Sequence, residues 1–211
     1  MTDNKDKIKD LLKFDNSNND CTYYYVQIIK RRKDNPDLER NEIKIGSFFL
    51  TDENKLEEYW NFIKERADRE NARVYISLNP RSLRRFTALC LMEYSKRVMN
   101  NSFDKSWKIP DSCALNKNSI KTRGITDSGR WVVDVDSNSE EIKNGVEEFI
   151  KTHTKILHIL KTPNGFHLIV SPFNYRKLDT FRISKSADDY KIDQGYEFTL
   201  RREGNTILYA P

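Results

Sequence analysis

The chain of 211 residues is long enough for one domain with a sizeable core, or for one domain with a small subdomain. Hydrophobic residues make up 37% and charged residues 33%, which excludes a disordered composition. The net charge of +5 favours a polyanionic partner only weakly, because 37 basic residues are largely offset by 32 acidic ones.

The cysteines and the N-terminus indicate the compartment. Cys21, Cys90 and Cys113 form no Cys-x-x-Cys pair, so neither a disulfide framework nor a zinc site is predicted, and a reducing cytoplasm is favoured. The first thirteen residues are charged and lack the apolar core of a signal peptide, and no apolar run reaches the length of a membrane span. We therefore expect a soluble intracellular protein that does not contact a membrane.

The first half of the chain alternates strand patterns with helix patterns. Residues of high strand propensity on either side of an Asn-Pro-Asp turn predict a hairpin, and apolar residues at i, i+3, i+4 and i+7 predict helices. In chain order we predict a helix over 6–14, paired strands over 23–30 and 43–50, a helix over 52–71, a strand over 73–78 and a helix over 83–99.

The second half begins after a polar region, 100–129, which we interpret as a linker or mobile loop with one helical turn. Ser137 and Glu140 form a capping-box pattern ahead of a helix, and Asn164-Gly165 is a strong hairpin signal. We predict a strand over 131–136, a helix to about 152, strands over 155–161 and 166–172, and a last hairpin of 196–202 with 206–209.

Two aspartates on the 131–136 strand are the first candidate functional residues. Residues two apart on a strand point to the same side, so Asp134 and Asp136 project together while Val133 and Val135 pack on the other face. Paired carboxylates suit one or two Mg²⁺ or Mn²⁺ ions. The alternative is a solvated sheet face, but the flanking Trp-Val-Val run indicates a central strand.

The hairpin that follows supplies further candidates. His167 lies just after a Gly-containing turn, on strands that we expect beside the aspartate strand, although a lone histidine is more often structural than catalytic. Gly165 allows close backbone approach, and Lys161 and Asn164 can offer donors to a phosphate. A third carboxylate would help to hold two metals; Asp193 is preferred over the other candidates, Asp188, Asp189 and Glu197.

In this order the motifs resemble those of the archaeo-eukaryotic primase superfamily, especially its plasmid and phage prim-pol type. Asp134 and Asp136 match the first motif, Gly165-Phe166-His167 the second and Ile192-Asp193 the third. The segment 73–81 is similar to the strand that ends the family's N-terminal module. The resemblance covers roughly residues 70–211 and rests on motif order, since each motif alone is short.

The resemblance implies an α/β (α+β) fold in which two mixed sheets meet at a cleft, the second built on an RRM-like β-α-β-β unit. It implies one catalytic core over 1–211, with an N-terminal module of about 20–100, a connection of about 100–129 and a metal-binding module of about 130–211. Asp134, Asp136 and Asp193 would bind Mg²⁺ or Mn²⁺. His167 would contact the phosphates of the incoming nucleotide, with Lys161 and Asn164.

The implied activity is template-directed nucleotidyl transfer by a primase or primase-polymerase. Its partners would be a single-stranded DNA template and nucleoside triphosphates, with a helicase or another replication protein as a further candidate, in the cytoplasm of a bacterium or a phage-infected cell. The chain departs from the family in having no zinc-binding cysteine set and a poorly defined third motif.

Basic residues suggest where nucleic acid could lie. Arg81, Arg84 and Arg85 cluster beside the Asn79-Pro80 turn, and we predict that they contact template or nucleotide. For the groups 31–33 and 201–202, a solvated face is at least as good an explanation. Two other functions stay open: a metal-dependent nuclease or phosphotransferase using the same aspartates, and a non-catalytic RRM-like module that binds nucleic acid.

Overall fold

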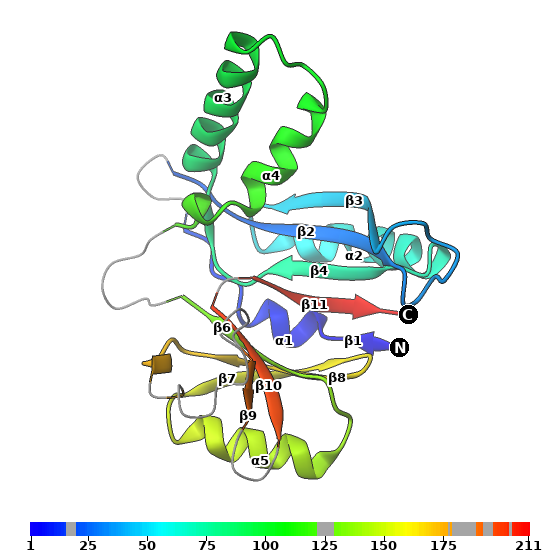
Figure 1. Ribbon diagram of the computed structural model, residues 1–211, viewed down its shortest axis with the longest axis vertical. Coiled ribbons are helices and arrows are strands. Elements are labelled where there is room, and N and C mark those ends of the chain that lie inside the picture. The colour runs from blue at the N-terminus through cyan, green and yellow to red at the C-terminus, as the bar shows by residue number, and fades with distance from the viewer. Residues whose placement is uncertain (16–19, 122–128, 177, 179–188, 192–195, 203) are drawn as a thin grey trace.

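The computed structural model shows an α+β fold with two antiparallel sheets (Figure 1). All residues are described except 16–19, 122–128, 177, 179–188, 192–195 and 203. The α+β class agrees with the prediction, but the sheets differ from the mixed sheets that were expected, because every pairing recorded between the described strands is antiparallel.

The first sheet combines the two ends of the sequence with its first half. Its strands run in the order β1-β11-β4-β2-β3, and the short β5 also pairs with β2. Helices α1 and α2 pack with it. The bounds are β1 Thr2–Asp3, α1 Lys5–Lys9, β2 Thr22–Arg31, β3 Glu42–Leu50, α2 Asn54–Arg69, β4 Arg73–Ser77, β5 Arg81–Ser82 and β11 Asn205–Ala210.

The second sheet is built from the second half of the chain, in the order β7-β8-β6-β10-β9. Helix α5 connects β6 to β7 and packs on one face of this sheet through Val146 and Ile150. The bounds are β6 Trp131–Val135, α5 Glu140–Lys151, β7 Ile156–Thr162, β8 Gly165–Val170, β9 Asp189–Lys191 and β10 Glu197–Arg201.

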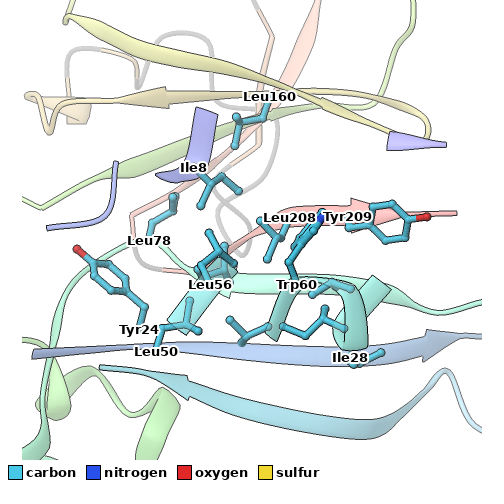
Figure 2. Packing of buried hydrophobic residues seen from close by; sticks show 14 of the residues in the cluster. Ile8, Tyr24, Ile28, Leu50, Leu56, Trp60, Leu78, Leu160, Leu208 and Tyr209 are labelled. Atoms are coloured by element: carbon cyan, nitrogen blue, oxygen red, sulfur yellow. The ribbon is translucent and has the colours of Figure 1, made fainter. Parts of the chain in front are cut away.

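A shared core joins the two sheets. Figure 2 shows Ile8 of α1 between Leu160 of the second sheet and Leu208 of the first, and all three belong to one buried cluster. Asn4 adds a polar connection, since its side-chain amide donates to Lys161 O on β7 at 2.8 Å and to Ile207 O on β11 at 3.2 Å. The sheets are therefore held in a fixed relation by both apolar packing and hydrogen bonds.

The triple-tyrosine run of β2 shows how a two-residue period divides the core. Tyr24 packs in the cluster between the sheets, whereas Tyr23 and Tyr25 pack on the opposite face with Ala114. All three rings are fully buried. The run is thus explained by a strand that is covered on both faces, since alternate residues of a strand point to opposite sides.

A helical arm projects from the first sheet on the side away from the second sheet (Figure 1). It consists of α3, Leu83–Met99, the 3-10 turn η1, Ser106–Lys108, α4, Ile109–Leu115, and the 3-10 turn η2, Lys117–Ser119. Ser82 caps α3 by accepting a hydrogen bond from Arg85 N at 3.0 Å. The region 100–129, predicted to be a linker or mobile loop with one helical turn, thus contains α4 and two 3-10 turns in its described part.

Two local predictions are wrong. The predicted last hairpin does not form: β10 pairs with β6 and β9, whereas β11 pairs with β4 and β1 in the other sheet. Helix α5 is capped by Ser139, whose hydroxyl accepts from Ile142 N at 3.4 Å, and not by Ser137. The first hairpin and the helices α2, α3 and α5 are confirmed within a few residues at each end.

Among the described residues, no helix is both long enough and apolar enough to span a bilayer.

Candidate functional site

The candidate site begins with the alternation of β6. Val133 and Val135 are buried in the same hydrophobic cluster as Val146 and Ile150 of α5. Asp134 and Asp136 line a cleft on the other face of the strand. The prediction that the two carboxylates share one side of the strand is therefore confirmed. Asp134 is buried, with 9% of its side chain exposed, and Asp136 is exposed just beyond the end of β6.

The register of the second sheet places His167 beside Asp134. The two residues are direct partners in the β6–β8 pairing, and His167 Nε2 lies 3.1 Å from Asp134 Oδ1. The other ring nitrogen, Nδ1, lies 2.8 Å from Thr206 Oγ1, which belongs to β11 of the first sheet. The imidazole is thus held between the two sheets, and both of its nitrogens contact protein groups.

Arg201 of β10 completes the surroundings of Asp134. One of its guanidinium nitrogens contacts Asp134 Oδ2, so the two carboxylate oxygens face different partners. Arg201 is 45% exposed, in contrast to the buried carboxylate. A long exposed side chain can exchange this contact for another anion, whereas His167 is fixed by its second hydrogen bond.

The pKa of the Asp134 carboxyl lies below its usual value. Burial raises this pKa, but the hydrogen bond with His167 and the favourable electrostatic interactions with His167, Arg201 and Lys33 outweigh that effect. Asp134 is therefore ionised at neutral pH, as a metal ligand or an ion-pair partner must be.

Cationic side chains from both sheets surround the two carboxylates. Arg31 and Lys33 come from the end of β2, Arg73 from β4 and Arg201 from β10. The cleft encloses about 150 Å³. Its lining residues are Arg31, Lys33, Arg73, Tyr75, Asp134, Asp136, Thr162, Asn164, His167, Arg201 and Ile207.

The cations are crowded, and this crowding favours an anionic ligand. Burial lowers the pKa of Lys33, and the nearby charges of Arg73 and Arg31 lower it further, against the opposing effect of Asp136 and Asp34. Arg73 is neutralised by Asp34, to which it donates two hydrogen bonds of 2.6 Å. An added phosphate would relieve the repulsion among the remaining cations.

The predicted nucleotide-binding residues of the hairpin divide into two groups. Asn164 lines the cleft, and its side-chain oxygen can accept from Lys33 Nζ at 3.0 Å. Lys161 does not line it: it pairs with Phe166, whereas Leu160 pairs with His167, so the side chain of Lys161 projects from the opposite face of the sheet. The two-residue period of β7 is the reason.

The backbone after β6 leaves no room for a side chain at position 165, so this position requires glycine. A Cβ atom at this position would lie 2.7 Å from Ser137 N and even closer to Val135 O, both backbone atoms at the end of β6. The close approach at Gly165 is therefore to the protein's own backbone, at the segment 135–137, and the contact of Gly165 with a nucleotide stays a prediction. The turn of this hairpin consists of Pro163 and Asn164, since Gly165 already pairs with Thr162.

The side chains of the cleft supply two of the ligands that a divalent cation needs. Mg²⁺ commonly binds through one or two carboxylates, with further ligands from water and substrate phosphates, and Asp134 and Asp136 can fill that role. Within the described ranges, no three His, Cys, Asp or Glu side chains are grouped as a metal site. Asp193 and Asp188 lie outside the described residues, and the side chain of Asp189 is likewise not described.

The three arginines predicted to contact nucleic acid do not line the cleft. The prediction is wrong for Arg81, because only 4% of this residue is exposed. Its Nη1 donates to Asn116 O at 2.8 Å and to Ser119 Oγ at 2.7 Å. Arg84 and Arg85 are exposed at the start of α3, on the arm.

Sequence reasoning missed several residues that the fold brings to the site. For Arg31, Lys33 and Arg201, the sequence leaves a solvated face at least as good an explanation as contact with nucleic acid, and it does not single out Thr206. Their positions depend on which sheet each strand joins, and no local pattern reports that. Comparisons with family models, with curated proteins and with solved structures give no significant match.

Proposed function

We propose that this protein is a nucleotidyltransferase of the primase or primase-polymerase type, which joins nucleoside triphosphates on a single-stranded DNA template. One observation carries the proposal: two carboxylates and the cationic side chains of Arg31, Lys33 and Arg201 converge in one cleft between two sheets. Carboxylates suit a divalent cation and the cations suit phosphates, so the cleft offers both halves of a metal–triphosphate site.

The residues would divide the work as follows. Asp134 and Asp136 would hold Mg²⁺ or Mn²⁺, which when bound neutralises phosphate charge and lowers the pKa of an attacking hydroxyl. Arg31 and Lys33 would bind the polyphosphate, and Arg201 would transfer from Asp134 to a phosphate oxygen. His167 would hold the carboxylate of Asp134 in place; a direct contact between its ring and phosphate requires exchange of one of its two present partners.

Two further features support the proposal. The order β7-β8-β6-β10 around the unit β6–α5–β7–β8 is the one expected of an RRM-like sheet. The cleft, at about 150 Å³, is smaller than sites that enclose whole ligands of drug size, so it suits the phosphates, with base and sugar outside.

The test is primer synthesis and extension on single-stranded DNA with Mg²⁺ or Mn²⁺ and nucleoside triphosphates. We expect product from the wild-type chain, none after chelation of the metal, and none from the Asp134→Asn/Asp136→Asn double variant. Asp104→Asn is the matched control, because Asp104 is an exposed carboxylate on the arm, far from the cleft lining. Activity retained by the double variant would contradict the proposal.

A second assay separates phosphate binding from catalysis. We expect Lys33→Ala and Arg31→Ala to weaken ATP binding by about tenfold each, the size of a lost charge-assisted contact. Arg69→Ala, which removes an exposed arginine at the end of α2, is the control. Cleavage of single-stranded DNA without added nucleotides would instead indicate a nuclease.

One observation favours a second candidate, a non-catalytic module that binds phosphate groups of nucleic acid. Both oxygens of Asp134 contact protein side chains, and the described part of the chain supplies no third carboxylate to the site. This candidate predicts binding of an oligonucleotide that chelators leave unchanged, with no primer product.

A further inference from the structure

The arm carries an apolar face that no described part of the protein covers. Helix α3 has no fully buried residue, and Leu91 and Val98 are each 63% exposed. Its inner side contacts the sheet through Leu83 and Phe86, which pack near Tyr23. The outer side is therefore available over most of a helix of 17 residues, about 25 Å long.

The exposed residues follow the spacing of a helix-packing seam. Arg84, Ala88, Leu91, Ser95 and Val98 recur at alternating intervals of four and three, and all five are exposed. Large residues at Leu91 and Val98 alternate with small ones at Ala88 and Ser95, which leaves hollows between projecting side chains. Such a surface accepts the side chains of a second helix in the manner of a coiled-coil seam.

The charge of the arm restricts what can cover this seam. The arm, residues 83–119, contains seven basic and three acidic side chains, a net charge of +4 out of the +5 of the whole chain. The three acidic residues lie off the seam and are already paired: Glu93 with Lys96, Asp104 with Lys105, and Asp111 with Lys44. A covering helix must therefore supply the negative charge.

Charge and shape together decide which kind of partner can bind the seam of α3. A second copy of the arm would bring another net charge of +4 against the first, and the two would repel. A nucleic-acid strand would gain little from the seam itself, because Leu91 and Val98 offer neither a stacking ring nor a hydrogen bond, and the exposed rings of the arm, Tyr94, Phe103 and Trp107, are not members of the seam. A lipid surface has no projecting side chains to fill the hollows at Ala88 and Ser95.

We propose that α3 is the docking surface for an acidic amphipathic helix of a partner protein, which packs along Leu91 and Val98 and is held by the basic residues of the arm. The proposal is independent of the chemistry in the cleft, since the arm lies on the other side of the first sheet (Figure 1).

The test uses a fluorescent three-heptad peptide with leucine at the a and d positions and glutamate elsewhere, together with a matched peptide that carries lysine in place of glutamate. We expect the acidic peptide to bind the full chain and the basic peptide to fail. Leu91→Glu/Val98→Glu should weaken the binding by at least about tenfold. Phe62→Glu, an exposed apolar residue of α2, is the matched control and should change nothing.

A second variant separates seam packing from general adhesion. Ser95→Trp fills a hollow while it adds apolar surface, so docking along the seam predicts weaker binding, whereas non-specific adhesion predicts stronger binding. Circular dichroism should show all variants to be folded, because the changed side chains are exposed.

Three outcomes would overturn the proposal. The first is equal binding of the acidic and basic peptides, or no binding up to roughly 100 µM. The second is a wild-type dimer in sedimentation that Leu91→Glu/Val98→Glu converts to monomer, which would assign the face to a second copy. The third is loss of oligo(dT) or anionic-vesicle binding in that variant without any peptide effect.

Discussion

Gly165 provides a direct test of how the site is assembled. Replacement by alanine would place a Cβ atom 2.7 Å from Ser137 N and still closer to Val135 O, and Cβ atoms in real proteins essentially never approach another atom to less than 3.0 Å. Both neighbours are backbone atoms of the segment 135–137, which carries Asp136, so no side chain can move aside. Strands β6 and β8 would have to separate at this point.

The cost can be estimated from overpacking. Forcing extra volume into a packed site costs about 1–3 kcal/mol, and the rigid backbone places Gly165→Ala at the upper end, about 3 kcal/mol. For a chain of this length, each kcal/mol lowers the melting temperature by about 2–4 °C, which gives a fall of roughly 6–12 °C.

The assay is thermal unfolding followed by circular dichroism, with Gly204→Ala as control. Gly204 has no atom within 4 Å of an added Cβ, so its replacement should change the free energy of unfolding by less than about 0.5 kcal/mol. If Gly165→Ala melted at the same temperature as Gly204→Ala, the close contact between β6 and β8 would be refuted.

Two other predictions concern the histidine bridge and the cysteines. Thr206→Val keeps the shape of the side chain but removes the hydroxyl beside His167 Nδ1. We expect this change to lower the free energy of unfolding, measured by denaturant titration, by about 1–3 kcal/mol. An unchanged free energy of unfolding would contradict the hydrogen bond between Thr206 and His167. Burial and then the hydrogen bond with Cys113 raise the pKa of Cys90 to about 12, so at pH 8 only about one thiol in ten thousand is ionised. An alkylating reagent should therefore modify exposed Cys21 long before Cys90, as followed by mass spectrometry. The alkylation rate at Cys90 should rise about tenfold per pH unit below its pKa. Equal alkylation rates of the two cysteines at pH 8 would contradict the raised pKa of Cys90.

Elements with a local signal were predictable from the sequence. The helices α2, α3 and α5 follow their apolar periods, and the β2–β3 hairpin follows its strand propensity and turn. The pairing of Asp134 with His167 was also within reach, since a helix and a hairpin after the aspartate strand bring the third strand beside the first.

The predictions that were wrong concern features that depend on contacts between distant segments of the chain. The sequence Glu203-Gly204-Asn205 has the composition of a hairpin turn, yet β10 before it and β11 after it belong to different sheets, because β11 pairs with β1 and β4. Arg201 was undervalued for the same reason, as its place beside Asp134 follows from the β6–β10 pairing. The misplacement of Lys161 was avoidable, since its one-residue offset from Leu160 already puts it on the other face.

The passage of the chain from β10 to β11 has a consequence for folding. Strand β11 lies between β1 and β4, so the first sheet stays divided until residues synthesised long after β4 reach it. Pairing over such a sequence separation is slow, and meanwhile the unpaired edge of β4 is open to intermolecular pairing. Because β11 also carries Thr206, the contact between Thr206 and His167 cannot form before β11 has joined the first sheet.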